Sequence, residues 1–205
     1  MATDTEGKSG GQKDGGLAAK LGNMDSGTGA VLGAAAVGLA AGLAANLGRK
    51  AVKQGVMTAA HGDWASALAA EHAALLKLFD QMEATGPNDE RKRSTLLTAM
   101  KAALLKHSVQ EENTVYPALR DAGEAAGADE LNHEHGYVKQ YLYDLEMMDK
   151  ASPEFLPTVA KFRTDIEDHM REEENDLYPR LRAKLSDAEN RKLTLAMNKE
   201  GFKVA

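Results

Sequence analysis

Cysteine is absent from this 205-residue chain, and aromatic residues make up only 5% of it. Without a thiol the chain can form no disulfide, no cysteine nucleophile and no iron–sulfur cluster. The sequence also has no glycine-rich phosphate loop, no nucleophile elbow and no segment with the alternating pattern of a β-strand. Any bound metal must therefore be held by imidazole and carboxylate groups.

Positive charge is scarce as well. The formal net charge is −6, and the one dense basic run, Arg91 to Arg93, is expected at an exposed helix start. Proteins that bind nucleic acid through its phosphates usually carry a basic face. We therefore expect no nucleic-acid partner.

The N-terminal part of the chain differs in composition from the rest. Residues 1–29 are rich in glycine, serine, lysine and aspartate, so we expect a disordered tail. Residues 30–60 are interpreted as an Ala/Gly-rich apolar helical segment and linker, in which residues 30–47 are apolar except for Asn46. A helix that packs on the bundle or on a second copy is favoured, and membrane association is the alternative. The run begins too late for a secretory signal, so we expect a cytoplasmic protein.

Apolar residues recur at helical spacing over residues 61–185, and prolines and glycines divide this region into four helices. We expect the helices at 64–85, 89–116, 131–150 and 152–178, with a loop at 123–129 and a bend or stop at Pro117 and Pro179. Residues 186–205 are expected to form a C-terminal helix and tail, opened by a capping box of Ser186 and Glu189. The prediction is all-α: an up-down antiparallel four-helix bundle with an N-terminal Ala/Gly-rich helix and a short C-terminal helix.

An internal repeat is the strongest signal in the sequence. Residues 107–120 (HSVQEENTVYPALR) and residues 169–182 (HMREEENDLYPRLR) agree at eight of fourteen positions. A Glu-His pair precedes each copy, and the two pairs lie 63 residues apart. Each unit is thus a helix with one histidine, followed by a helix with His-x-x-x-Glu, whose two side chains share one face.

Four histidines from four helices can therefore meet at one level of the bundle, together with two glutamates. A single His-x-x-x-Glu would more often be a polar pair on a solvated face, but its recurrence favours a metal site. Buried imidazoles and carboxylates need a positive group between them, and this donor set suits iron, manganese or zinc. The candidate ligands are His72, His107, Glu111, His135, His169 and Glu173.

These residues resemble the hemerythrin-like family, the HHE cation-binding domains, over roughly residues 64–182. The resemblance implies a non-haem centre of two iron ions (Fe²⁺/Fe³⁺) with an oxo or hydroxo bridge. It implies that the four histidines bind iron and that Glu111 and Glu173 bridge the pair. The oxygen carriers of the family have a further histidine one turn along the third helix, and here that position holds Lys139.

The absent histidine leaves the centre short of ligands. Two six-coordinate ions offer about twelve positions, of which glutamates, histidines and a solvent-derived bridge fill about ten. Either neighbouring carboxylates fill the gap or act beside the ligands, or the centre stays open to small molecules. The candidate carboxylates are Glu112, Glu174 and Glu134.

Several conspicuous residues are interpreted as structural. His61 is expected in a solvated loop, and His133 on an exposed helix face. Tyr116 and Tyr178 lie half a turn from their histidines by regular helical counting, which favours anchors at the bend over ligands.

The functional prediction is a di-iron protein that binds O2, nitric oxide or peroxide, or that senses oxygen, redox or iron state. One alternative is an enzyme that uses the same centre to decompose hydrogen peroxide or to reduce nitric oxide. A second alternative is a membrane-associated or self-assembling stress protein that acts through residues 30–47.

Overall fold

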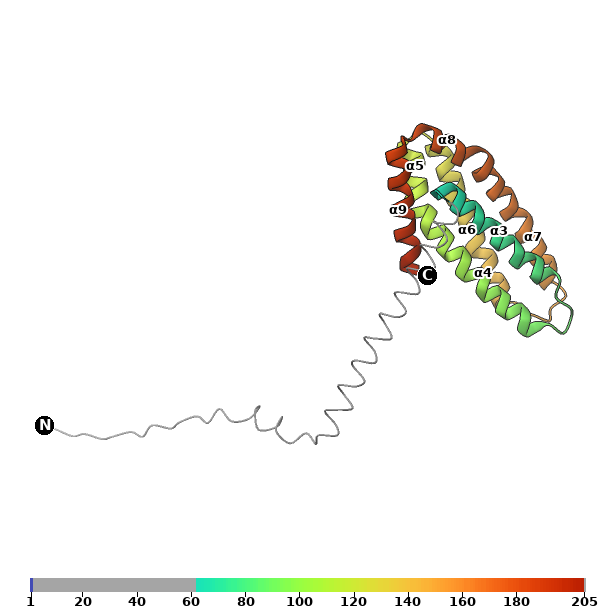
Figure 1. Cartoon of the computed structure of the whole chain (residues 1–205). Helices are drawn as coiled ribbons and strands as arrows, with labels where there is room; N and C mark the ends of the chain where they lie inside the picture. The colour runs from blue at the N-terminus through green and yellow to red at the C-terminus, as the bar shows by residue number, and fades with distance from the viewer. Residues whose placement is uncertain (2–61, 205) are drawn as a thin grey trace, which may run out of the picture. The chain divides into compact units, whose positions relative to one another are not determined.

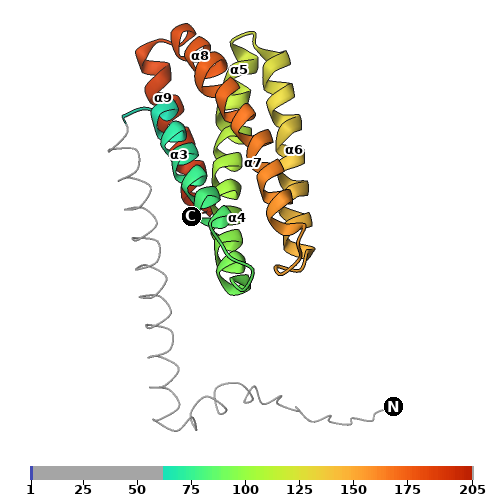
Figure 2. The ribbon, with the colours of Figure 1, turned by 90° about the vertical axis from the view of Figure 1, so that its right-hand side faces the viewer.

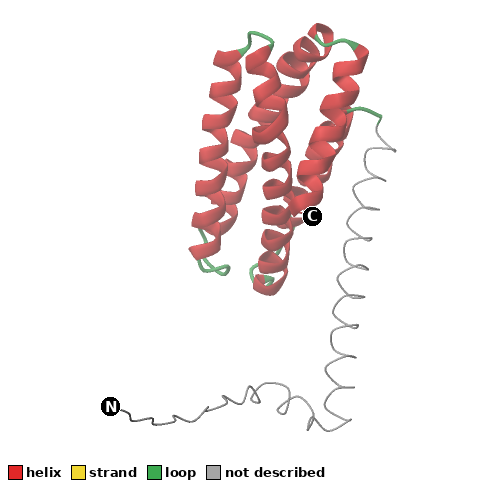
Figure 3. Ribbon diagram, turned by 90° about the vertical axis from the view of Figure 1, so that its left-hand side faces the viewer, coloured by secondary structure: helices red, strands yellow, loops and turns green. Residues whose placement is uncertain are grey.

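The computed structural model describes Met1 and residues 62–204. Within this range every regular element is a helix, and short loops join the helices (Figure 3). The all-α prediction is thus confirmed. No helix in this part of the chain combines the length and the apolar character needed to cross a membrane. The expectations for residues 1–29, residues 30–60 and His61 lie outside the described residues.

Four long helices form an up-down bundle in which successive helices run in opposite directions (Figures 1 and 2). They are α3 (Trp64–Glu83), α4 (Glu90–Gln110), α6 (Ala125–Met147) and α7 (Phe155–Glu172). Both α3 and α6 pack against α4 and α7, so the four helices enclose one interior. A further helix, α9 (Asp187–Val204), packs mainly along α4.

The second and fourth helices continue past their prolines, because each contains a widened turn. After α4 the chain passes through a π turn, η1 (Glu111–Val115), into α5 (Tyr116–Asp121). After α7 it passes through η2 (Glu173–Leu177) into α8 (Tyr178–Lys184). In each copy the tyrosine N–H donates to the glutamate carbonyl five residues back, and the following proline has no N–H to donate. The expected bend or stop is therefore a π turn within a continuous helix.

The third helix begins at Ala125, six residues before its predicted start. The expected loop at 123–129 shortens to residues 122–124, where Gly123, with φ of 86°, allows the turn. Gly127 lies inside the helix, where an added Cβ would come within 2.9 Å of Leu177 Cδ2. That glycine allows close packing between helices and does not mark a turn.

Two helix starts show how local side chains set the boundaries. The capping box at α9 is confirmed: Ser186 N–H donates to Glu189 Oε2 at 2.8 Å, and Glu189 N–H donates to Ser186 Oγ at 3.3 Å. Ser152, at the predicted start of the fourth helix, accepts from Glu154 N–H at 3.2 Å, and α7 begins only at Phe155.

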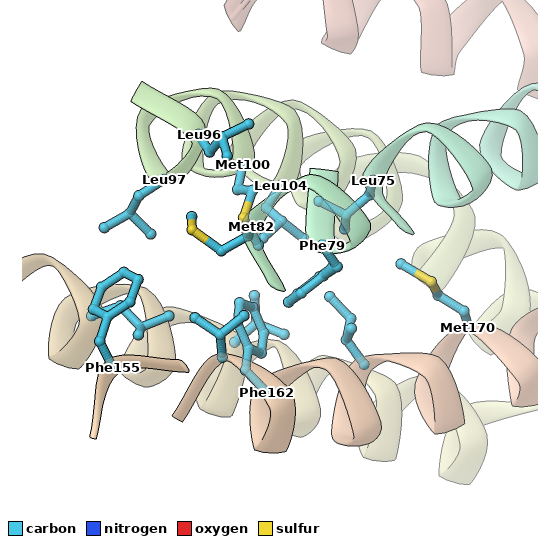
Figure 4. Packing of buried hydrophobic residues seen from close by; sticks show 14 residues of the cluster. Leu75, Phe79, Met82, Leu96, Leu97, Met100, Leu104, Phe155, Phe162 and Met170 are labelled. Atoms are coloured by element: carbon cyan, nitrogen blue, oxygen red, sulfur yellow. The ribbon is translucent and has the colours of Figure 1, made fainter. Parts of the chain in front are cut away.

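Two apolar clusters fill the bundle interior, one on each side of the His-x-x-x-Glu level. The first contains Phe79, Met100 and Phe162, and Figure 4 shows its side chains meeting between the helices. The second contains Trp64 and Leu131 and lies toward α5 and α8. Burial of this apolar surface supplies the main stabilisation, and the clusters shield the level between them from water.

Candidate metal centre

The four histidines of the repeat converge in the bundle interior, each from a different helix. All are buried: His72 from α3 is 2% exposed, His107 from α4 is 6%, His135 from α6 is 2% and His169 from α7 is 5%. The Nε2 atoms of His72 and His107 lie 2.8 Å apart. The ring centroids of His135 and His169 lie 5.1 Å apart. The histidines therefore form two pairs, and the two helices of one repeat supply each pair.

The two glutamates of the motif lie between these pairs and are fully buried. Glu111 Oε2 is 3.1 Å from His107 Nε2 and 3.4 Å from His135 Nε2. Glu173 Oε2 is 3.5 Å from His169 Nε2 and 3.4 Å from His72 Nε2. Each carboxylate thus faces one histidine of each pair, and the arrangement follows the two-fold repeat of the sequence.

The donor atoms are spaced closely enough to surround metal ions. Atoms of His72, His107, Glu111 and Glu173 all lie within 4.8 Å of one another. Atoms of Glu111, His135 and His169 form a second group by the same measure. Because Glu111 belongs to both groups, the cluster provides two adjacent positions that share a carboxylate, as bridged two-metal sites do.

A second layer of carboxylates orients the imidazole rings. His72 Nδ1 lies 2.7 Å from Glu174 Oε1, and His135 Nδ1 lies 2.9 Å from Glu112 Oε1. His169 Nδ1 lies 2.7 Å from Glu134 Oε2. A carboxylate that accepts from Nδ1–H leaves Nε2 free for a metal, which is the usual arrangement around metal-binding histidines. The structure thus places Glu112, Glu174 and Glu134 beside the imidazoles, on the side away from the centre.

One member of this layer, Glu71, was missed by the sequence reasoning. Its Oε2 lies 3.5 Å from His107 Nδ1, and its other oxygen pairs with Lys106. The signal was available, because Glu71 precedes His72 as Glu134 precedes His135 in the repeat. The four outer carboxylates therefore obey the same two-fold relation as the histidines.

The tyrosine hydroxyls reach the bundle interior, which regular helical counting did not predict. The hydroxyl of Tyr116 donates to Glu173 Oε1 at 2.9 Å and lies 3.1 Å from His135 Nε2. The hydroxyl of Tyr178 donates to Glu111 Oε1. A π turn closes its hydrogen bond over five residues instead of four, so each hydroxyl comes around to the interior. No sequence signal except the recurring Tyr-Pro after each motif could have indicated this.

Burial and mutual charge shift the pKa values within the cluster. Burial alone would lower the pKa of His107, but the carboxylates of Glu111 and Glu71 outweigh it and raise the pKa to about 10. Burial likewise opposes a rise at His135, yet Glu111 and Glu112 bring its pKa to about 9. The protons on these rings supply positive charge between the carboxylates, and a metal cation would supply it in their place.

Two buried atoms at the centre test whether a metal fits. His169 Nε2 and Glu173 Oε2 have no hydrogen-bond partner, although both are shielded from water. Buried polar atoms without partners are rare and call for an explanation. A cation between the ring nitrogen and the carboxylate would satisfy both atoms, so the donor set fits a metal site.

Two residues of the third helix, His133 and Lys139, lie away from the bundle interior. His133 is exposed and lies 3.3 Å from the Tyr137 hydroxyl, as expected for a histidine away from the centre. Lys139, at the position of the absent histidine, donates to Glu112 Oε1 at 2.9 Å and has 62% of its side chain exposed. Lys139 therefore neutralises an outer carboxylate and does not reach the interior.

Comparison with known proteins matches residues 65–181 to the family described as the hemerythrin HHE cation binding domain. A protein of Nostoc sp. named DNA nickase is 27% identical over 116 residues, which are 57% of this chain and 32% of that protein. An uncharacterized hemerythrin-like protein of Schizosaccharomyces pombe is 34% identical over 91 residues, which are 42% of this chain and 44% of that one. The matches thus span less than half the length of these curated relatives. No solved structure matches the chain.

Proposed function

Because the chain belongs to the hemerythrin HHE cation-binding family, we propose that its buried cluster holds two iron ions that bind a small ligand. The observation that carries this proposal is the position of the glutamates. Each carboxylate faces one histidine of each pair, at 3.1 to 3.5 Å. A pair of bridged ions explains this sharing, whereas a single ion would leave one histidine pair unused.

The residues divide into two groups around the proposed ions. His72 and His107 would hold one ion and His135 and His169 the other, with Glu111 and Glu173 shared. Iron, when bound, supplies Lewis acidity and one-electron redox chemistry. The protein would orient the imidazoles through the outer carboxylates and keep bulk water away through the flanking apolar clusters.

The open coordination positions and the close packing of the bundle interior together indicate which class of small molecule can bind. Six protein ligands and a solvent bridge leave about two of twelve coordination positions for other molecules. Lys139 is bonded to Glu112 and turned to solvent, so it fills neither position. The closely packed interior favours O2, nitric oxide or peroxide over any larger substrate. Binding or sensing of such a ligand is the function we propose.

Turnover is the second candidate function, and the same open positions favour it. An enzyme that decomposes hydrogen peroxide or reduces nitric oxide would need two exchangeable positions at adjacent ions. The two functions differ in a steady-state assay. A binding protein takes up ligand in proportion to its concentration, whereas an enzyme consumes excess peroxide or nitric oxide at a sustained rate.

Two other roles depend on features outside the cluster. The Nostoc relative is named for DNA nicking, but the net charge of −6 here gives nucleic acid no favourable electrostatic attraction. Action at a membrane or by self-assembly rests on residues 30–47, which lie beyond the described part of the chain. Deletion of residues 2–50 would then abolish pelleting with vesicles while leaving the iron spectrum intact.

Metal analysis of protein reconstituted with ferrous iron under anaerobic conditions tests the main proposal. We expect two iron ions per chain and an absorption change on exposure to air or nitric oxide. The double variant Glu111→Ala/Glu173→Ala should lose iron, and His133→Ala, which removes an exposed histidine of the same helix as His135, should retain it. One iron or less per wild-type chain would contradict the proposal.

A further inference from the structure

Two buried hydroxyl groups lie at the centre without a role in the proposed ligand set. Tyr116 is 0% exposed and Tyr178 is 2% exposed. Each follows its own glutamate by five residues, yet each donates to the glutamate of the other repeat. The hydroxyls therefore connect the two halves of the centre crosswise.

The two oxygens of each carboxylate have different partners. In Glu111, Oε1 accepts from the Tyr178 hydroxyl, whereas Oε2 faces the Nε2 atoms of His107 and His135 and lies 3.5 Å from the Tyr116 hydroxyl. In Glu173, Oε1 accepts from the Tyr116 hydroxyl at 2.9 Å. Its Oε2 faces the Nε2 atoms of His72 and His169. In each carboxylate, Oε1 accepts the shorter tyrosine hydrogen bond and Oε2 faces both metal positions.

Packing holds the ring of Tyr178 in place. Trp64 packs edge-on against Tyr178, with 5.2 Å between ring centroids. The indole N–H of Trp64 in turn donates to Asn190 Oδ1 of α9 at 3.0 Å. The ring of Tyr178 also lies nearly parallel to that of His72, with 6.5 Å between the centroids. The position of this hydroxyl is therefore set by α3, α8 and α9 together.

From this geometry we propose that Tyr116 and Tyr178 are positioning residues that hold the shared carboxylates and tune the bound iron; the proposal rests on the proposed di-iron function. A hydrogen bond to a ligating carboxylate draws electron density from it and so favours the reduced metal. Each hydroxyl also fixes the rotation of the carboxylate before metal arrives. Loss of a hydroxyl then weakens metal binding in both halves, because each glutamate serves both ions.

The experiment compares Tyr116→Phe and Tyr178→Phe with the control Tyr141→Phe. Phenylalanine keeps the ring packing and removes only the hydroxyl. Tyr141 also donates to a carboxylate, Asp165, at 2.5 Å, but it is half-buried and packs on Phe162 of the apolar cluster. Iron affinity is measured by competition with a chelator, the midpoint potential by spectroelectrochemistry, and helicity by circular dichroism. These readouts separate tuning of the centre from a general loss of structure.

We expect the control to match the wild type in iron affinity and potential. Each of the other two variants should bind iron about 10–100-fold more weakly and have a lower midpoint potential, at unchanged helicity. Wild-type affinity and potential in both variants would overturn the inference while leaving the di-iron proposal standing. A phenolate-to-iron absorption band that Tyr116→Phe abolishes would also overturn it, because Tyr116 would then be a ligand. Failure of the wild type to bind iron would overturn both proposals.

Discussion

Metal binding should release protons, because the buried imidazoles are protonated when no metal is present. The pKa of His107 is raised to about 10 and that of His135 to about 9, because Glu111 faces Nε2 of both rings. In addition, Glu71 lies beside Nδ1 of His107, and Glu112 lies beside Nδ1 of His135. At pH 7 both rings are in the doubly protonated imidazolium form, and a metal can bind only the neutral imidazole. Loading should therefore release about two protons from these rings, and affinity should rise about a hundredfold per pH unit near neutrality.

The number of released protons should fall as the pH approaches the two pKa values. At pH 10 His107 is about half protonated and His135 about one tenth, so these rings release only about 0.6 proton. Calorimetric titration with ferrous iron in buffers of different ionisation enthalpy measures the count at each pH. His133→Gln, which removes an exposed imidazole, should leave the count unchanged. Release of fewer than one proton at pH 7 would refute the reasoning, because the rings would then be neutral before metal arrives.

Three further predictions concern the second layer, the core and the metal-free protein. Glu174→Ala should weaken iron binding about 10–100-fold in a chelator competition, because His72 loses its orienting acceptor. Phe79→Ala should lower the free energy of unfolding by about 3–5 kcal/mol in urea, since Phe79 is fully buried. The folded-state pKa values of His107 and His135 are raised, so their stabilisation is complete below about pH 6.5. It is lost as pH rises to about 10, and a thermal midpoint that held constant from pH 7 to 10 would contradict this.

The ligand level of the bundle could be predicted because it depends only on helical periodicity. His107 and Glu111 lie four residues apart on one face, and the repeat places His169 and Glu173 in the same relation. When the bundle buries the first His-x-x-x-Glu motif in its interior, the repeat brings the second motif to the facing side of the same level. The structure brings all of these side chains together, although their role as iron ligands remains a proposal.

The tyrosines and the exact helix ends could not be predicted in the same way. Regular counting assumes about 3.6 residues per turn, and it fails where η1 and η2 each insert a wider turn. Nothing in the residues between Glu111 and Tyr116 distinguishes a π turn from a helix that ends at the following proline. The early start of α6 places Gly127 inside the helix, close to Leu177, a residue far away in sequence.

X-ray absorption at the iron edge, combined with metal analysis, tests the central claim most directly. Protein loaded with iron should contain two ions per chain, each with nitrogen and oxygen ligands and with a second iron at about 3.5–4 Å. This result would require the shared position of Glu111 and Glu173 that the structure provides. A single iron per chain with no iron neighbour, or ligation without imidazole, would contradict the account.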